Sequence, residues 1–295
     1  MSSSAARTPL ARALGRAGFG GLPLEIWVAI ANGWSAGGPR ISAADAKEFA
    51  RAHPEVVQSY ETADGARYDR PARIGPTTVG DTLASLAELD AETSSAERAD
   101  AIALELVALL KKPSPDRGVA EFLRRSVPDE CAYGTGKAIE ALRALAGISE
   151  IDSLLGTALF KRARRVSPND QVSLLREAMS LFQAHGDLAA VAETRAALAD
   201  ALEKSGSPHA AVVELERVLT EYRSLAPQNE FYGRSIGVAL LNLGRLYEVT
   251  GRRKEAKQVT KAAIAEFRWG ASGDRHTLAN LSRAKDQLSR LRWRR

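Results

Sequence analysis

Apolar side chains recur with a helical period through the second half of the chain. From residue 150 onward they lie three and four residues apart, and short breaks rich in Gly, Pro or Ser interrupt them. This spacing places apolar side chains on one face of an α-helix, and the breaks are typical of turns. The pattern predicts a series of amphipathic helices, which cover residues 150–164, 171–184, 188–204, 208–224, 230–249, 253–268 and 275–292.

Part of this pattern is an internal repeat. The stretch NLGRLYEVTGR at 242–252 aligns with NLSRAKDQLSR at 280–290, an offset of 38 residues, with Asn, Leu and Arg in register. Three predicted helices also end in an aromatic residue, at Phe182, Tyr222 and Phe267. Because one helix pair cannot bury its apolar face alone, a repeated helix–turn–helix unit predicts that neighbours stack into a solenoid.

The repeated unit resembles the tetratricopeptide repeat, with its best copy over residues 237–270. Small residues at the motif's positions let two helices approach closely, and larger residues fill the seam between them. Copies lie 38 to 45 residues apart, which is longer than is usual in the family. The resemblance implies a right-handed solenoid of three and a half repeats, capped by the last helix. The motif positions are occupied here by Leu240, Leu243, Gly244, Tyr247, Gly251, Ala256 and Ala263.

The same resemblance implies a concave groove, lined by the first helix of each pair, that takes an extended peptide or a partner helix. Asn242 and Asn280 stand where such repeats often present an Asn to a bound backbone, and an amide both donates and accepts hydrogen bonds. Arginines one turn further along could hold a carboxylate. The alternative is that these polar residues form an ordinary solvated face. The predicted partner-binding residues are Asn242, Arg245, Glu248, Asn280, Arg283 and Asp286.

The N-terminal segment predicts helices followed by a β-hairpin. LPLEIWVAIANGW places its large apolar residues on one helical stripe, and SAADAKEFARA predicts a second helix with Ser42 as its N-cap. VVQSYETADGARYD alternates on both sides of Asp64-Gly65, which predicts a tight hairpin turn. Helices followed by a hairpin are the order of a winged-helix fold.

This segment resembles the winged-helix segment that follows the ATPase core in bacterial STAND ATPases. There a similar GLP…IW helix, a loop, a second helix and a hairpin precede helical repeats, as they do here. We expect no nucleotide-binding core in this chain, so the resemblance does not extend to ATP-driven switching. Between the two regions, connecting helices are predicted at 81–91, 95–112, 117–126 and 136–146.

The predicted fold class is therefore mainly α: a tetratricopeptide-like solenoid with a small N-terminal winged-helix-like domain. The predicted domains are a winged-helix-like domain with an N-terminal arm over 1–80, a helical connector over 81–149 and the repeats with a capping helix over 150–295.

Composition and charge narrow the function classes. The chain has 295 residues, 45% apolar and 26% charged, which is ordinary soluble composition. Its single cysteine, Cys131, excludes an internal disulfide framework and a Cys-rich zinc site, and no apolar run is long enough to span a bilayer. We expect a cytoplasmic protein without membrane association. The net charge is +5, of which residues 268–295 contribute +6, so a local nucleic-acid contact is possible at that basic end.

Two motifs suggest catalysis at first sight. Residues 33–37 contain G-x-S-x-G, the spacing of a hydrolase nucleophile elbow around Ser35. An elbow needs a strand–turn–helix and earlier strands of a sheet, and only 34 residues precede Ser35. We interpret the motif as a Gly/Ser loop between two helices.

The second motif, CAYGTGKA at 131–138, resembles a phosphate-binding loop. Cys131 stands where the first Gly belongs, and Ala138 replaces the hydroxyl residue that would hold magnesium. We therefore expect no nucleotide there, and predict that Thr135 caps the helix GKAIEALRALAG. The four histidines show no metal-ligand spacing.

The sequence thus predicts a non-catalytic adaptor or sensor, without cofactor or metal, that binds a protein or peptide in the groove of its repeats. The alternative is a DNA-binding transcriptional regulator whose winged helix reads DNA and whose repeats receive a signal. The segment expected to be the recognition helix carries Asp45, Lys47, Glu48 and Arg51, which sum to zero, whereas groove-reading helices are usually basic.

Overall fold

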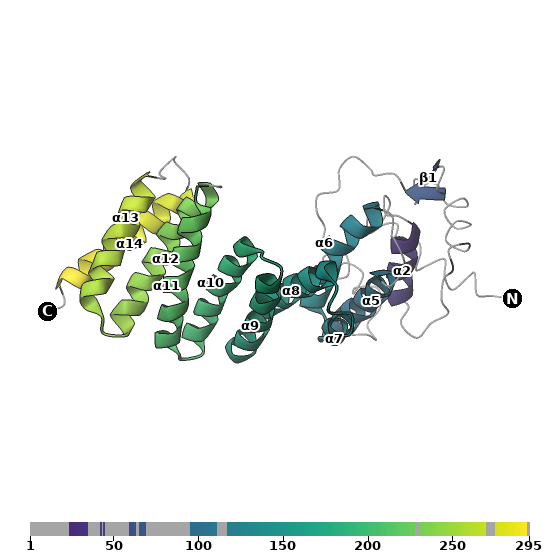
Figure 1. The fold of residues 1–295 in the computed structure, drawn as a ribbon, viewed down its shortest axis with the longest axis horizontal. Coiled ribbons are helices and arrows are strands. Elements are labelled where there is room, and N and C mark those ends of the chain that lie inside the picture. The colour runs from purple at the N-terminus through teal and green to yellow at the C-terminus, as the bar shows by residue number, and fades with distance from the viewer. Residues whose placement is uncertain are drawn as a thin grey trace. The chain divides into compact units, whose positions relative to one another are not determined.

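A computed structural model describes most of the chain, which divides into two compact units, residues 1–165 and 166–295. Within the described residues the fold is mainly α-helical, as predicted, with one two-stranded sheet (Figure 1). The helix predicted at 81–91 and nearly all of the predicted recognition helix lie outside the described residues. The described residues are 24–34, 42, 44, 59–62, 65–68, 95–110, 117–227, 230–269 and 275–293.

The first unit is built from helices that pack on a central pair, α5 and α6. Helix α2 packs on α5, α5 packs on α6 and α7, and α8 packs on α6 and α7. Its largest fully buried side chains come from all five helices and include Ile26, Ile102, Leu123, Leu142 and Leu159. The described elements are α2 (Leu24–Trp34), β1 (Ser59–Thr62), β2 (Gly65–Tyr68), α5 (Ser95–Leu110), α6 (Arg117–Tyr133), α7 (Lys137–Arg143) and α8 (Ser149–Ala163).

The predicted hairpin is present, but its turn lies one residue earlier in the chain than predicted. Strands β1 and β2 are antiparallel, with Ser59 opposite Tyr68 and Thr62 opposite Gly65. Gly65 is therefore the first residue of β2 and not part of the turn. The connection is made by residues 63 and 64, which lie outside the described residues.

Helix α6 is longer than predicted. We expected it to end at residue 126, shortly before a proline, but it continues through Pro128 to Tyr133. A proline inside a helix costs about 3 kcal/mol because one backbone hydrogen bond is lost. The turns around Pro128 bury Val127 and Cys131 completely against the neighbouring helices, and that burial offsets the cost.

The boundary between the units lies at residue 165 and not at residue 149, where the sequence predicted it. The reason is α8, which was expected to be the first helix of the repeats. Its apolar residues Leu154, Leu155 and Leu159 are buried, and the helix packs against α6 and α7 within the first unit.

The second unit is a stack of helices in which each packs on the next along the chain (Figure 1). Short turns connect them, so neighbours run in opposite directions, as the predicted helix–turn–helix units require. The bounds agree with the predicted ones to within three residues. The helices are α9 (Pro168–Ala184), α10 (Leu188–Lys204), α11 (Pro208–Leu225), α12 (Glu230–Val249), α13 (Arg253–Trp269) and α14 (Arg275–Trp293).

Three helices of the stack end in the same turn. Gly186, Gly206 and Gly251 each follow a helix with φ of 68°, 84° and 79°, in the left-handed region that favours glycine. The N–H of the next residue then donates to the carbonyl five positions back, at 3.0, 2.8 and 2.7 Å. This is the Schellman helix end, and its recurrence gives α10, α11 and α13 a similar start.

Helices α13 and α14 pack tightly against α12 at Gly244. A Cβ at this position would lie 2.5 Å from Thr260 Oγ1 and 2.9 Å from Gln287 Nε2. The small residues Ala256 and Ala263 are fully buried nearby on α13. These observations confirm the prediction that Gly and Ala allow the helices of this pair to pack closely.

Candidate functional site

A pocket of about 400 Å³ opens within the second unit. Three alternate helices, α10, α12 and α14, supply its walls, and α11 and α13 supply side chains to its floor. Alternate helices of an antiparallel stack lie on the same side, and this is the arrangement that the predicted groove requires. The lining residues are Ala196, Leu215, Tyr222, Arg234, Ser235, Val238, Ala239, Asn242, Phe267, His276, Thr277 and Asn280.

The floor of the pocket is apolar and aromatic. Leu215, Tyr222 and Phe267 are buried, and the Tyr222 ring lies 5.7 Å from the ring of Tyr232 on α12. Burial raises the pKa of Tyr222 to about 12, and the nearby carboxylate of Glu193 adds to the effect. Tyr222 therefore remains a neutral hydroxyl at physiological pH, and the floor carries no charge from it.

Two of the six predicted binding residues line the pocket. Asn242 on α12 is exposed and Asn280 on α14 is half-buried, and the aligned repeat positions place both amides in the same pocket. The apolar side chain of Val238, one turn before Asn242, also lines it and remains 39% exposed. The pocket thus combines two amides with accessible apolar surface.

Arg245 is engaged within the chain itself. Both terminal nitrogens of its guanidinium donate to the carboxylate of Glu203 at the end of α10. This hydrogen-bonded pair raises the pKa of Arg245. The sequence predicted that Arg245 would hold a ligand carboxylate, but its side chain links α12 to α10 and does not line the pocket.

The other three predicted residues also lie outside the pocket lining. Glu248 is half-buried on α12, whereas Arg283 and Asp286 are exposed on α14. Each lies one or two turns beyond an Asn that does line the pocket, because the pocket extends toward the other end of both helices. Asn242 and Asn280 therefore line the pocket, and the other four predicted residues lie on the turns that follow them.

Sequence reasoning missed the residues at that other end. Ser235, Val238, Ala239 and Asn242 follow the spacing i, i+3, i+4, i+7, so they share one face of α12. Extending the helical face backward from Asn242, and likewise from Asn280 to Thr277, would have identified them. Arg234 and His276 complete this end of the lining, and both make contacts within the chain.

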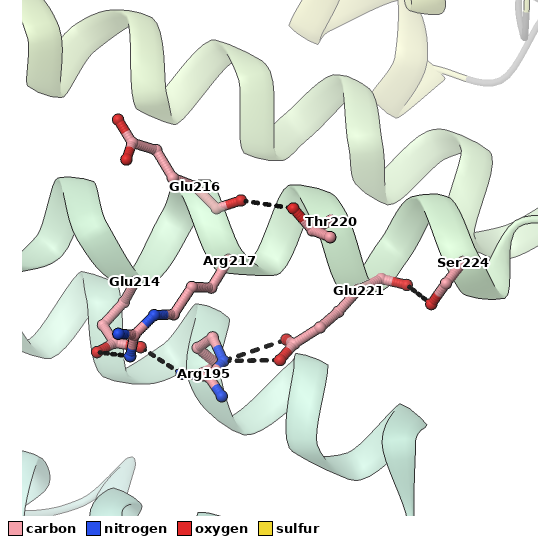
Figure 2. Close-up of polar contacts among 7 residues, drawn as sticks. All are labelled: Arg195, Glu214, Glu216, Arg217, Thr220, Glu221 and Ser224. Carbon is pink, nitrogen blue, oxygen red and sulfur yellow. Dashed lines mark hydrogen bonds and ion pairs between the residues drawn. The ribbon is translucent and has the colours of Figure 1, made fainter.

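A buried arginine joins two helices of the pocket (Figure 2). Arg195 on α10 is 6% exposed and donates from Nη1 to Glu214 at 2.6 Å and from Nε to Glu221 at 2.9 and 3.2 Å. Both carboxylates belong to α11, and Glu214 also contacts Arg217 at 3.5 Å. Ala196, the next residue on α10, lines the pocket, so this ion cluster fixes the position of the α10 wall.

The first glycine of the G-x-S-x-G motif has a packing role. Residues 24–34 before Ser35 form helix α2, whereas a nucleophile elbow requires a strand there. Gly33 lies against α5, and a Cβ on it would be 2.5 Å from the Cα of Ile102. Ser35 itself lies outside the described residues.

We expect Gly33→Ala to destabilise the first unit by about 1–2 kcal/mol. The added methyl group would collide with the α5 backbone, an overpacking cost of roughly 1–3 kcal/mol that exceeds the usual gain of Ala over Gly in a helix. Thermal unfolding followed by circular dichroism measures the effect. Gly233→Ala in α12 is the matched control, because a Cβ there meets nothing within 4 Å and should not destabilise; equal effects at both positions would contradict the packing role.

The loop that resembles a phosphate-binding loop surrounds a carboxylate of the chain. The backbone N–H of Thr135 donates to Asp100 Oδ2 at 2.8 Å, the N–H of Gly136 donates to Oδ1 at 3.4 Å, and the Thr135 hydroxyl also donates to Oδ2. A Cβ on Gly134 would collide with the same carboxylate. On the other side, Arg162 donates to three backbone carbonyls of the loop.

The prediction that Thr135 caps the next helix is therefore wrong. The N-cap of α7 is Gly136, with φ of 117° and no side-chain capping bond. The Thr135 hydroxyl is directed to Asp100 because a charged acceptor forms the stronger hydrogen bond. The loop N–H groups that resembled a phosphate site are satisfied by Asp100.

Unlike Asp100, a second carboxyl of the first unit has no hydrogen-bond partner among the described residues. Glu130 on α6 is 0% exposed, and neither of its oxygens is bonded. The cations that face α6 from α8 are engaged elsewhere, Lys161 with Asp129 at 2.6 Å and Arg162 with the loop carbonyls. Burial, and then the charge of Asp129, raise the pKa of Glu130 to about 8.

Among the described residues, no group of three or more His, Cys, Asp or Glu side chains is arranged to hold a metal ion. In the same part of the chain, no helix combines the length and the apolar character needed to cross a membrane. Comparison of the sequence with protein-family models and with curated proteins gave no match.

Proposed function

We propose that this chain is a non-catalytic adaptor or sensor. In this proposal α9–α14 form a tetratricopeptide-like solenoid whose pocket binds an extended peptide segment of a partner protein. The observation that carries it is the convergence of Asn242 and Asn280 beside an apolar floor in one pocket. A side-chain amide can donate to a peptide carbonyl and accept from a peptide N–H, so two of them suit an extended backbone.

The size and lining of the pocket define the expected ligand. About 400 Å³ lies within the range of small-ligand pockets and has room for one or two apolar peptide side chains. Val238 and Phe267 offer apolar contact surface for such a side chain. Because Arg245 is paired with Glu203, recognition does not depend on a ligand carboxylate at that position.

Filling the pocket is expected to abolish peptide binding. Val238→Trp places an indole in the pocket from a residue that is already 39% exposed, so the fold should tolerate the change. Peptides selected from a random display library against the full chain should lose affinity for this variant by about tenfold or more, which corresponds to roughly 1.4 kcal/mol. Fluorescence anisotropy of the selected, labelled peptides measures the loss.

The matched control is Val213→Trp. Val213 is 45% exposed on α11 and does not line the pocket. The selected peptides should bind this variant and the unmodified chain equally. If the selected peptides bind Val238→Trp as tightly as the unmodified chain, or lose the same affinity for both variants, the binding surface lies elsewhere and the proposal is refuted.

A further inference from the structure

The charge of the second unit is concentrated in its last two helices. Helix α13 contains five Lys or Arg and two Asp or Glu, and α14 contains five and one, so together they carry +7. Helices α9 to α12 together carry −3, with seven basic and ten acidic residues. Positive charge is therefore concentrated in α13 and α14, the two helices at the C-terminal end of the stack (Figure 1).

Four cations form a straight row on α13. Lys254, Lys257, Lys261 and Arg268 are spaced by three, four and seven residues, so at 100° per residue they fall within an arc of about 60°. At 1.5 Å per residue the row is about 21 Å long. The two acids of the helix, at positions 255 and 266, lie on average more than 90° away around the axis. We call these four residues the α13 cationic row.

The cations of this row are available for a ligand. All four are exposed, and so are Arg283 and Arg290 on α14. None of the six forms an ion pair or hydrogen bond within the described part of the chain. The arginines on α10 and α12 behave differently: Arg195 pairs with Glu214 and Glu221, and Arg245 pairs with Glu203.

The described side chains of α13 and α14 lack the features of a protein interface or a membrane anchor. Protein interfaces need apolar anchors at their centre, and membrane-surface helices need apolar residues that enter the bilayer. Leu278 is the one large apolar side chain that is exposed among the described side chains of α13 and α14. A row of exposed cations without such anchors among the described side chains matches a ligand that is itself a regular row of negative charge.

We propose that the α13 cationic row binds the phosphate backbone of a nucleic-acid duplex, independently of base sequence. A duplex is a rigid rod with one charge per about 1.7 Å of its axis, so a straight row about 21 Å long can contact several phosphates at once. This surface is separate from the pocket, and its function does not depend on the proposed peptide binding.

The test is binding of a fluorescein-labelled DNA duplex of mixed sequence to the full chain at several salt concentrations. The row variant combines Lys254→Gln, Lys257→Gln and Lys261→Gln, which keep good helix formers on an exposed face. The slope of log K against log salt should fall by about 2–3, because each lost phosphate contact removes about 0.9. At 100 mM salt the affinity should fall by about tenfold or more.

The matched control removes the same charge from other helices of the unit, with Arg176→Gln, Lys204→Gln and Arg223→Gln. All three residues are exposed and belong to α9, α10 and α11. A control affinity within threefold of the unmodified chain supports the proposal. Equal losses in both variants would show that only net charge matters, and would overturn it. Binding to phosphatidylserine vesicles without duplex binding would assign the α13 cationic row to membranes and would also overturn the proposal.

Discussion

Replacing Glu130 with methionine is expected to stabilise the first unit, and by much more at pH 8 than at pH 5. In the folded chain the pKa of Glu130 is about 8, whereas an unfolded glutamate titrates near 4.5. Between these values the unfolded state releases a proton that the folded state retains, so the free energy of unfolding falls as pH rises. The destabilisation caused by Glu130 is absent below pH 4.5 and reaches its full size above pH 8. Between pH 5 and pH 8 this change is on the order of 3–4 kcal/mol.

The groups around Glu130 do not cancel this effect. Lys161 is paired with Asp129, and Asp100 and Arg162 are hydrogen-bonded to the loop after α6. Burial raises the pKa of Cys131 to about 12, so the neighbouring thiol stays neutral through the whole window. The charge of Glu130 is therefore expected to change as the pH approaches 8.

Hydrogen exchange measured by mass spectrometry separates the two units. Peptides from α6 report on the first unit, and peptides from α10 serve as an internal reference in the second. After correction for intrinsic exchange, protection of α6 should decline from pH 5 to pH 8 in the unmodified chain and remain nearly level in Glu130→Met. Parallel pH profiles for the two proteins would contradict a protonated, unpartnered Glu130.

The helices of the second unit could be predicted from sequence because local signals agree there. Apolar spacing, a Ser or Asp before the first turn and a glycine after the last turn all mark the same bounds. Ser167 and Asp187 accept N–H bonds as N-caps, and Gly186 and Gly206 adopt left-handed conformations. Each signal acts within a few residues, so no tertiary information is needed.

The sequence-based predictions were wrong where residues far away along the chain determine a helix end or a hydrogen bond. Pro128 does not end α6, since α5 and α8 cover the following turns. Thr135 does not cap α7, because Asp100, 35 residues earlier, attracts its hydroxyl. Arg245 is withdrawn from the groove by Glu203, 42 residues earlier. A single sequence does not reveal which acids will lie beside which donors, so the pairing of Arg245 with Glu203 could not be predicted.

Replacing Arg195 with methionine is expected to destabilise the second unit by roughly 3 kcal/mol. The side chains of Glu214 and Glu221 are 16% and 26% exposed, so without the guanidinium two poorly solvated carboxylates on α11 would be left without their partner from α10. Removing one partner of a buried ion pair costs about 3–5 kcal/mol, and the partial exposure of the glutamates places the effect at the lower end. Urea unfolding followed through the exchange of α10 and α11 peptides measures the loss.

The same cluster provides its own control. Replacing all three members together, as Arg195→Met, Glu214→Leu and Glu221→Leu, leaves no unpaired charge and should recover most of the stability, because buried ion clusters can be replaced by apolar residues at little cost. Lys204→Met, which breaks an exposed pair with Asp200, should cost less than about 1 kcal/mol. If the triple variant were as unstable as Arg195→Met, lost packing of the long arginine side chain would explain the effect, and the desolvated carboxylates would not.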